Sequence, residues 1–264
     1  MNGSVRWFSA NADKAWAEKF FLLYSPVWMA VMGAVQLGGW FKQWSDPAFM
    51  VYGLAVMAPL LVVPALARRS SGIAWHRSYW LRFNLWIWIF VYFGSYVGSH
   101  YFFDVLGMRY RFPTTWNLDA ALVGSDKGEV PFFLYPVTQA YFVTYHTLMV
   151  VLLRRLRTGL RPGRATTALA VVALSYAVAW AETFFMANEL ISDTFEYLDL
   201  PRMLRYGSLF YASYFVVSLP MVYRLDEDET EPQWPLGRVA VESLAAGMLV
   251  FFLLDAWAMI IGPL

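Results

Sequence analysis

Long apolar segments alternate with shorter polar connections along the whole chain. A helix that crosses the hydrocarbon core of a bilayer needs roughly 17–25 mostly apolar residues. Seven segments meet this requirement, and they cover residues 20–40, 48–67, 83–103, 131–153, 165–187, 206–223 and 239–261. Because lipid cannot hydrogen-bond to the backbone, each segment is expected to be helical. The pattern predicts an all-α polytopic membrane bundle of about seven transmembrane helices, in a single domain over residues 1–264.

Composition supports a membrane protein and excludes several other classes. Hydrophobic residues make up 59% of the chain and charged residues only 15%, whereas soluble domains carry about 25% charged residues. A soluble enzyme and a disordered protein are therefore excluded. The net charge of +1 lacks the basic excess of a nucleic-acid-binding protein. With no cysteine, the chain has no disulfide, thiol nucleophile or cysteine-ligated metal.

The distribution of basic residues predicts the orientation. If the bundle has seven spans, most of the 20 lysines and arginines lie on the same side as the N-terminus, and the exceptions are Lys42, Arg109, Arg111, Lys127, Arg202 and Arg205. The positive-inside rule then places the N-terminus in the cytoplasm. The polar first 18 residues do not form a cleavable signal peptide.

Two connections have distinct expectations. The acidic run 226–231 is expected to be a solvated loop. The connection from Asp104 to Val130 either covers one membrane face as a lid or is loose.

Few ionisable groups lie inside the predicted spans. A charge at the bilayer centre costs at least ~2.5–3.5 kcal/mol, so each such group is a candidate functional residue. At a rise of ~1.5 Å per residue, His100, Glu182 and Asp255 fall roughly 6–10 Å below the non-cytoplasmic boundary. Asp104 and Asn188 lie just above this layer, whereas His146 lies ~22 Å down.

Spacing within the spans suggests acid–base chemistry. Tyr92, Tyr96, His100 and Asp104 follow one another at four-residue intervals, which predicts one stripe along a helix. Removal from water favours the neutral form of Glu182, and a protonated carboxyl group beside an imidazole can perform general acid–base catalysis. The alternative is that these groups only form hydrogen bonds between helices.

The same positions argue against other membrane functions. A retinal protein needs a lysine within a span, but all four lysines of this chain lie outside the spans. Haem ligation by two histidines is excluded because His100 and His146 differ in depth by ~16 Å. A proton-coupled transporter that uses the buried acid remains a possible class, although no pair of broken spans at repeated positions is present.

Long ordered stretches resemble the cycloeucalenol cycloisomerases, also called cyclopropyl sterol isomerases. The likeness extends from about Asn11 to Leu264 and rests on KFFLLYSPVW from Lys19, HRSYWLRFNLWIWIF from His76, GSHYFFDVLGMRYRFP from Gly98, TYHTLMVVLLRRLR from Thr144, LSYAVAWAETFFMAN from Leu174, YGSLFYASYFVVSLPMVYRLDE from Tyr206 and RVAVESLAAGMLVFFLLDAW from Arg238. The stretch AETFFMAN also looks like the carboxylate-bearing span of the emopamil-binding sterol isomerases.

The resemblance implies an isomerase that opens the 9β,19-cyclopropane ring of a sterol to give a Δ8 sterol. It implies a cyclopropyl sterol as substrate, contact with membrane lipid, and no metal or organic cofactor. It also implies residence in the cytoplasmic membrane of a bacterium or the endoplasmic reticulum of a eukaryote. The main alternative is a membrane protein that binds or transports sterols without turnover.

The resemblance suggests roles for the candidate residues. Glu182 donates a proton to the bridging carbon and His100 accepts or relays the C8 proton, or these two roles are reversed. Asp104 or Asp255 orients the histidine. The remaining candidates for substrate contact are Tyr92, Tyr96 and Trp180, whose rings can stabilise a cation, Asn188, which can bind the sterol hydroxyl, and His146.

Overall fold

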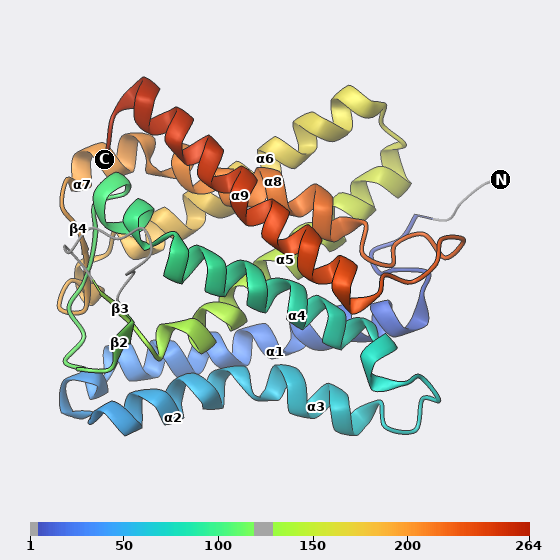
Figure 1. Cartoon of the computed structure of the whole chain (residues 1–264), viewed down its shortest axis with the longest axis horizontal. Coiled ribbons are helices and arrows are strands. Elements are labelled where there is room, and N and C mark those ends of the chain that lie inside the picture. Colours follow the sequence, from blue (N-terminus) through green and yellow to red (C-terminus); the bar gives the residue numbers. More distant parts are fainter. Residues whose placement is uncertain (1–4, 119–128) are drawn as a thin grey trace.

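Helices dominate the computed structural model, which describes residues 5–118 and 129–264. Most of the long helices run along the longest axis of the molecule (Figure 1). The long helices are α1 (Ala12–Leu37), α2 (Asp46–Met57), α3 (Pro59–Ala67), α4 (Tyr79–Tyr92), α5 (Leu134–Leu160), α6 (Arg164–Met186), α8 (Ser208–Tyr223) and α9 (Leu236–Ile261). The structure confirms an all-α multi-pass membrane bundle.

Within the described residues, five helical segments are long and apolar enough to cross a membrane. They are Ala12–Leu37, Asp46–Ala67, Leu134–Leu160, Arg164–Met186 and Leu236–Ile261, and they coincide with the first, second, fourth, fifth and seventh predicted segments. The third and sixth correspond to α4 and α8, which are shorter and are extended by π-helical turns. The total of seven spans therefore stays a prediction.

Two π-helical turns shape the third predicted span. They are η3 (Phe93–Val97) and η4 (Tyr101–Val105), and Gly98 lies between them. A Cβ atom at Gly98 would lie 2.4 Å from the Gly94 carbonyl oxygen and 2.6 Å from the Phe251 ring, so only glycine lets α9 pack this closely. Contacts expected from the predicted stripe of four side chains occur within both pairs, since Tyr92 stacks on Tyr96 and His100 contacts Asp104.

Short elements gather at the end of the bundle where α1 ends and α2 begins (Figure 1). Strand β1 (Met108–Tyr110) pairs with β4 (Phe195–Tyr197), and β2 (Asn117–Leu118) pairs with β3 (Val130–Pro131), both antiparallel. The other short elements at this end are η1 (Trp40–Gln43), η5 (Glu189–Ile191), α7 (Leu200–Arg202) and η6 (Met203–Gly207), whereas η2 (Trp75–Arg77) lies at the opposite end, between α3 and α4 (Figure 1). The described part of the predicted lid thus contributes strands β1 and β2, and residues 119–128 lie outside the described residues.

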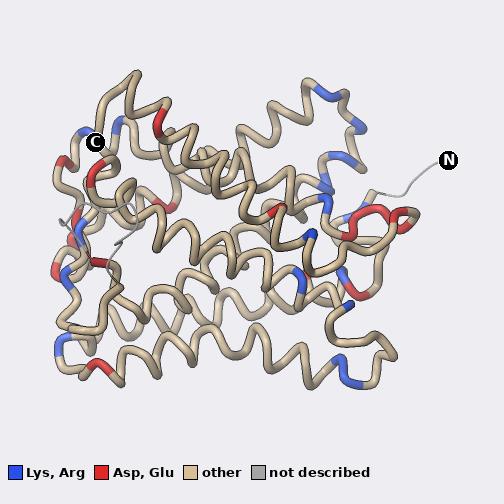
Figure 2. Tube along the Cα trace, viewed as in Figure 1, with Lys and Arg blue, Asp and Glu red and all other residues tan. Residues whose placement is uncertain are grey.

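Charged residues gather at the two ends of the bundle, and the middle is almost free of them (Figure 2). Part of the acidic run 226–231 is not solvated as expected. The Asp226 carboxylate pairs with buried Arg82, and that of Glu227 pairs with buried Arg154. The expectation of a solvated loop was wrong for these two residues, because buried arginines on other helices need anionic partners.

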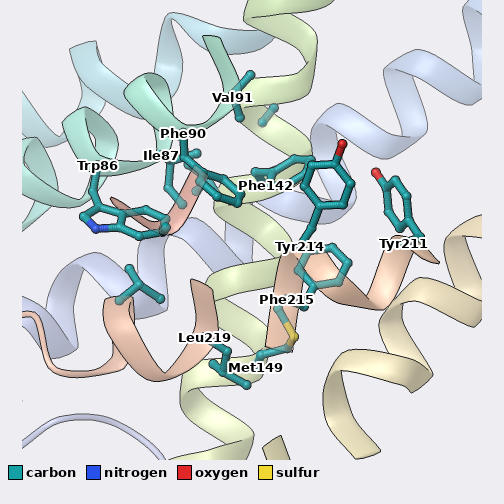
Figure 3. Packing of buried hydrophobic residues seen from close by; sticks show 14 of the residues in the cluster. Trp86, Ile87, Phe90, Val91, Phe142, Met149, Tyr211, Tyr214, Phe215 and Leu219 are labelled. Atoms are coloured by element: carbon teal, nitrogen blue, oxygen red, sulfur yellow. The ribbon is translucent and has the colours of Figure 1, made fainter. Parts of the chain in front are cut away.

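An aromatic core joins α4, α5 and α8 in the middle of the bundle (Figure 3). Phe90 of α4 and Phe142 of α5 lie 5.9 Å apart between ring centroids, and Phe142 lies 5.7 Å from Phe215 of α8. All three rings are buried. This packing fixes the position of α8, which carries one side of the site described next.

Candidate active site

Glu182 lies on α6, close to the helix α8 against which α6 packs. The residues that α6 buries follow at four-residue intervals and are Val171, Ser175, Ala179 and Thr183. Glu182 stands at the edge of this face, and its side chain is half-buried. Its Oε1 atom accepts a hydrogen bond of 2.6 Å from the hydroxyl group of Tyr211 on α8. Its Oε2 atom is buried and has no hydrogen-bond partner among the described residues.

Tyrosine side chains surround this carboxyl group. The Tyr145 hydroxyl group of α5 also interacts with it. Four more phenols lie within electrostatic range, and they belong to Tyr110, Tyr141, Tyr197 and Tyr214. Tyr110 and Tyr197 come from the paired strands β1 and β4. No lysine, arginine or histidine pairs with Glu182 within the described part of the chain.

His100 and Asp104 form a second polar group. His100 Nδ1 lies 2.8 Å from Asp104 Oδ2, and the histidine side chain is 39% exposed. Because the carboxylate accepts from Nδ1–H, the Nε2 atom of a neutral His100 keeps a lone pair that can accept a proton. Next to it, the Tyr101 hydroxyl group donates to Asp255 Oδ1 over 3.0 Å, so Asp255 contacts a tyrosine rather than the histidine.

The predicted layer is thus divided into two groups. No hydrogen bond, ion pair or ring contact among the described residues joins Glu182 to His100. Aromatic rings lie between the groups, since Phe102 stacks on Tyr214 at 6.4 Å and Tyr214 packs on Tyr211 at 5.3 Å.

The residues predicted to contact substrate are distributed over several places. The rings of Tyr92 and Tyr96 stack at 5.7 Å on the side of the third span that packs against Tyr135. Trp180 is 54% exposed on α6 and stacks on Phe184. Among the described residues, no hydrogen bond joins these side chains to Glu182, although α6 carries both Trp180 and Glu182.

The other two candidates are held by local hydrogen bonds. Asn188 is exposed, and its Oδ1 atom accepts from the Leu190 backbone at the start of η5. His146 is fully buried between the Phe142 carbonyl oxygen, 2.8 Å from Nδ1, and the Ser218 hydroxyl group, 2.7 Å from Nε2. Since a carbonyl oxygen can only accept, Nδ1 carries the hydrogen and Nε2 accepts from Ser218.

Tyr211 and Tyr145 were not predicted from the sequence. Aromatic residues are frequent in this chain, so neither tyrosine differs from the others by composition. One signal was present. At ~1.5 Å per residue, Tyr211 lies about 8 Å into the sixth predicted span, which is the depth predicted for Glu182. A comparison of the predicted membrane depths of tyrosines, as well as of charged residues, would have placed Tyr211 at the level of Glu182.

The fold and the carboxyl site define a multi-pass helical membrane protein with a buried acid–phenol centre. The chain is 37% identical to the cycloeucalenol cycloisomerase of Arabidopsis thaliana over 266 residues, which cover 98% of this chain and 90% of that protein. The chain belongs to the cycloeucalenol cycloisomerase family and is therefore an isomerase. No protein-family model and no solved structure matches the chain.

Proposed function

We propose that this protein opens the 9β,19-cyclopropane ring of a cyclopropyl sterol, such as cycloeucalenol, and releases a Δ8 sterol. Membership of the cycloisomerase family supports the reaction class. The observation that carries the assignment of the site is the carboxyl group of Glu182, whose Oε2 atom is buried and lacks a partner among the described residues. We also propose that the N-terminus faces the cytoplasm, in keeping with the distribution of basic residues.

The reaction needs one proton donor and one proton acceptor. A proton is delivered to C19 while the C9–C19 bond breaks, which leaves a methyl group on C10 and a positive charge at C9. Loss of the C8 proton then forms the C8–C9 double bond. One proton enters and one leaves, so the sterol is isomerised without oxidation or reduction.

Glu182 is the proton donor in this proposal. A carboxyl group that is removed from water and has no cationic partner favours its neutral form, which carries the proton to be donated. The unpartnered Oε2 atom is the position from which that proton reaches the substrate. Once the ring has opened, the phenol rings near Glu182 can stabilise the cation through their faces.

His100 is the proton acceptor, acting directly or by relay. Asp104 holds Nδ1–H, and the Nε2 lone pair takes the proton. This assignment is separable from that of Glu182, because the structure keeps the two groups apart. If His100→Ala retained full turnover, the acceptor would instead be the carboxylate that Glu182 becomes after donation.

Substitution of Glu182 tests the proposal. Membranes containing the Glu182→Gln variant are incubated with cycloeucalenol, and the sterols are analysed by mass spectrometry. Loss of a general acid is expected to lower turnover by about 10²–10⁴-fold. Glu189→Gln is the matched control, because this nearby glutamate is exposed in η5 and its variant should turn over at the normal rate.

Isotope incorporation tests the proton transfer itself. In D₂O, the wild-type protein should place one deuterium in the new methyl group, because a carboxyl proton exchanges with solvent. Full turnover by Glu182→Gln would remove this residue from the mechanism. Sterol binding without any product would instead indicate a binding or trafficking protein.

A further inference from the structure

Tyr211 donates a hydrogen bond to Glu182. Its hydroxyl group donates to Oε1 over 2.6 Å, and its own side chain is only 8% exposed. The ring is held by its neighbours on α8, with centroid distances of 5.3 Å to Tyr214 and 5.8 Å to Phe215. Figure 3 shows the hydroxyl groups of Tyr211 and Tyr214 directed to the same side of α8. The donor is thus fixed by packing that does not involve Glu182.

This contact makes the two oxygen atoms of the carboxyl group different. An oxygen atom that accepts from a phenol behaves as the carbonyl oxygen of a neutral carboxylic acid, so the acidic hydrogen resides on the other oxygen. That other atom is Oε2, which is buried and has no partner among the described residues. Tyr211 therefore directs the acidic hydrogen away from α8.

The same contact becomes stronger during proton donation. As the proton leaves Oε2, negative charge spreads over both oxygen atoms, and the bond from Tyr211 changes from a neutral to a charge-assisted hydrogen bond. An interaction that strengthens in the transition state lowers the barrier, whereas one of constant strength does not. Tyr211 is well placed to supply such an interaction because its ring need not move.

We propose that Tyr211 is a positioning residue for the proton donor: it fixes the acidic hydrogen on Oε2 and stabilises the carboxylate that forms on Glu182. This inference rests on the proposed function, because it assigns a role only if Glu182 donates the proton. It adds a residue to the site that acts through Glu182 and does not need to touch the sterol.

Tyr211→Phe removes only the hydroxyl group and keeps the ring. Loss of a hydrogen bond to a developing charge is expected to lower kcat by roughly 10- to 100-fold. The KM for the sterol should be unchanged, since the removed group contacts the acid. The solvent deuterium isotope effect on kcat should increase, because proton transfer then limits the rate more strongly. A merely structural tyrosine would not change this isotope effect.

Tyr52→Phe is the matched control. Tyr52 of α2 is 8% exposed, as Tyr211 is, and its hydroxyl group has no hydrogen-bond partner among the described residues. The variant should keep the kcat and the isotope effect of the wild type. Thermal unfolding of both variants in detergent reports the amount of folded protein, so that kcat is expressed per folded molecule.

The outcomes separate this inference from the proposed function. If Glu182→Gln is inactive and Tyr211→Phe matches Tyr52→Phe in kcat and isotope effect, the role of Tyr211 is refuted while the proposed function stands. If Glu182→Gln remains active, the proposed function fails first. A decrease in kcat for Tyr211→Phe without any change in the isotope effect would also overturn the inference.

Discussion

Replacement of Arg154 by methionine should destabilise the protein strongly. The guanidinium group lies at the end of the bundle that carries the N-terminus and is fully buried. Its Nη1 and Nη2 atoms donate to Glu18 over 2.9 and 2.6 Å, and its Nε and Nη2 atoms donate to Glu227 over 2.6 and 2.7 Å. Nη1 also donates to the Trp7 carbonyl oxygen over 3.0 Å. One side chain thus links α5 to α1, to the N-terminal segment and to the connection before α9.

The expected loss follows from what the substitution leaves behind. Glu18 is 1% exposed, and without Arg154 the one hydrogen bond that its carboxylate keeps among the described residues is that of 3.1 Å from the Ser9 backbone N–H group. Glu227 retains Lys14, at 2.8 Å. Removal of one partner from a buried ion pair costs about 3–5 kcal/mol, because a buried charge is left without compensation. This is a large part of a typical unfolding free energy of about 5–15 kcal/mol.

Thermal unfolding of the purified protein in detergent measures this loss. Arg154→Met should lower the Tm by roughly 10 °C, whereas an exposed arginine such as Arg69 should be replaceable by methionine with a change within about 0.5 kcal/mol. The double variant Arg154→Met with Glu18→Gln should recover part of the loss, because the unpaired charge is gone. Equal melting temperatures for Arg154→Met and Arg69→Met would refute the reasoning.

Two further predictions concern packing and pH. Gly98→Ala should destabilise the protein by several kcal/mol, because the added Cβ atom would overlap the Phe251 ring. In the control Gly33→Ala, the added Cβ atom meets no atom within 4 Å, so this variant should be neutral or stabilising. Equal melting temperatures of the two variants would contradict this prediction. Burial acts to raise the pKa of Glu227, but the hydrogen bonds from Arg154 and the charge of Lys14 outweigh it and hold this pKa below its usual value. A depressed pKa adds stability that is present above pH ~4.5 and is lost as the pH falls further. The difference in unfolding free energy between wild type and Glu227→Gln should therefore shrink from pH 6 to pH 3, and a constant difference would argue against it.

The helices were predictable because their cause is local. A run of apolar residues long enough to cross the lipid must form a helix, because the backbone has no other hydrogen-bond partner there. The start of α1 also has a local cause, since the Asn11 side chain accepts hydrogen bonds from the backbone N–H groups of Asp13 and Lys14 over 3.0 and 3.2 Å. The close approach of Phe251 from α9 to Gly98 was not predictable, because it joins residues that lie far apart in the sequence.

The candidate site was predictable only in part, for a similar reason. Glu182 stands out in the sequence because an ionisable group inside a membrane span is energetically costly and is therefore a candidate functional residue. The spacing of four residues between His100 and Asp104 correctly predicted their contact. Depth alone cannot tell which side of a helix faces which neighbour. For that reason His100 and Glu182 share a predicted level without touching, and Tyr211, which does contact Glu182, was missed.

The ion pairs at the two ends of the bundle differ in burial. The end that carries the N-terminus holds the pairs of Arg154 with Glu18 and Glu227, and Arg154 is fully buried. At the opposite end, the pairs Lys42–Asp193 and Arg111–Glu196 are largely exposed to solvent. An exposed ion pair contributes only about 0–1 kcal/mol, whereas removal of one partner from a buried pair costs about 3–5 kcal/mol. Substitution of a charged residue is therefore expected to lower the unfolding free energy much more at the N-terminal end than at the end that carries the short strands.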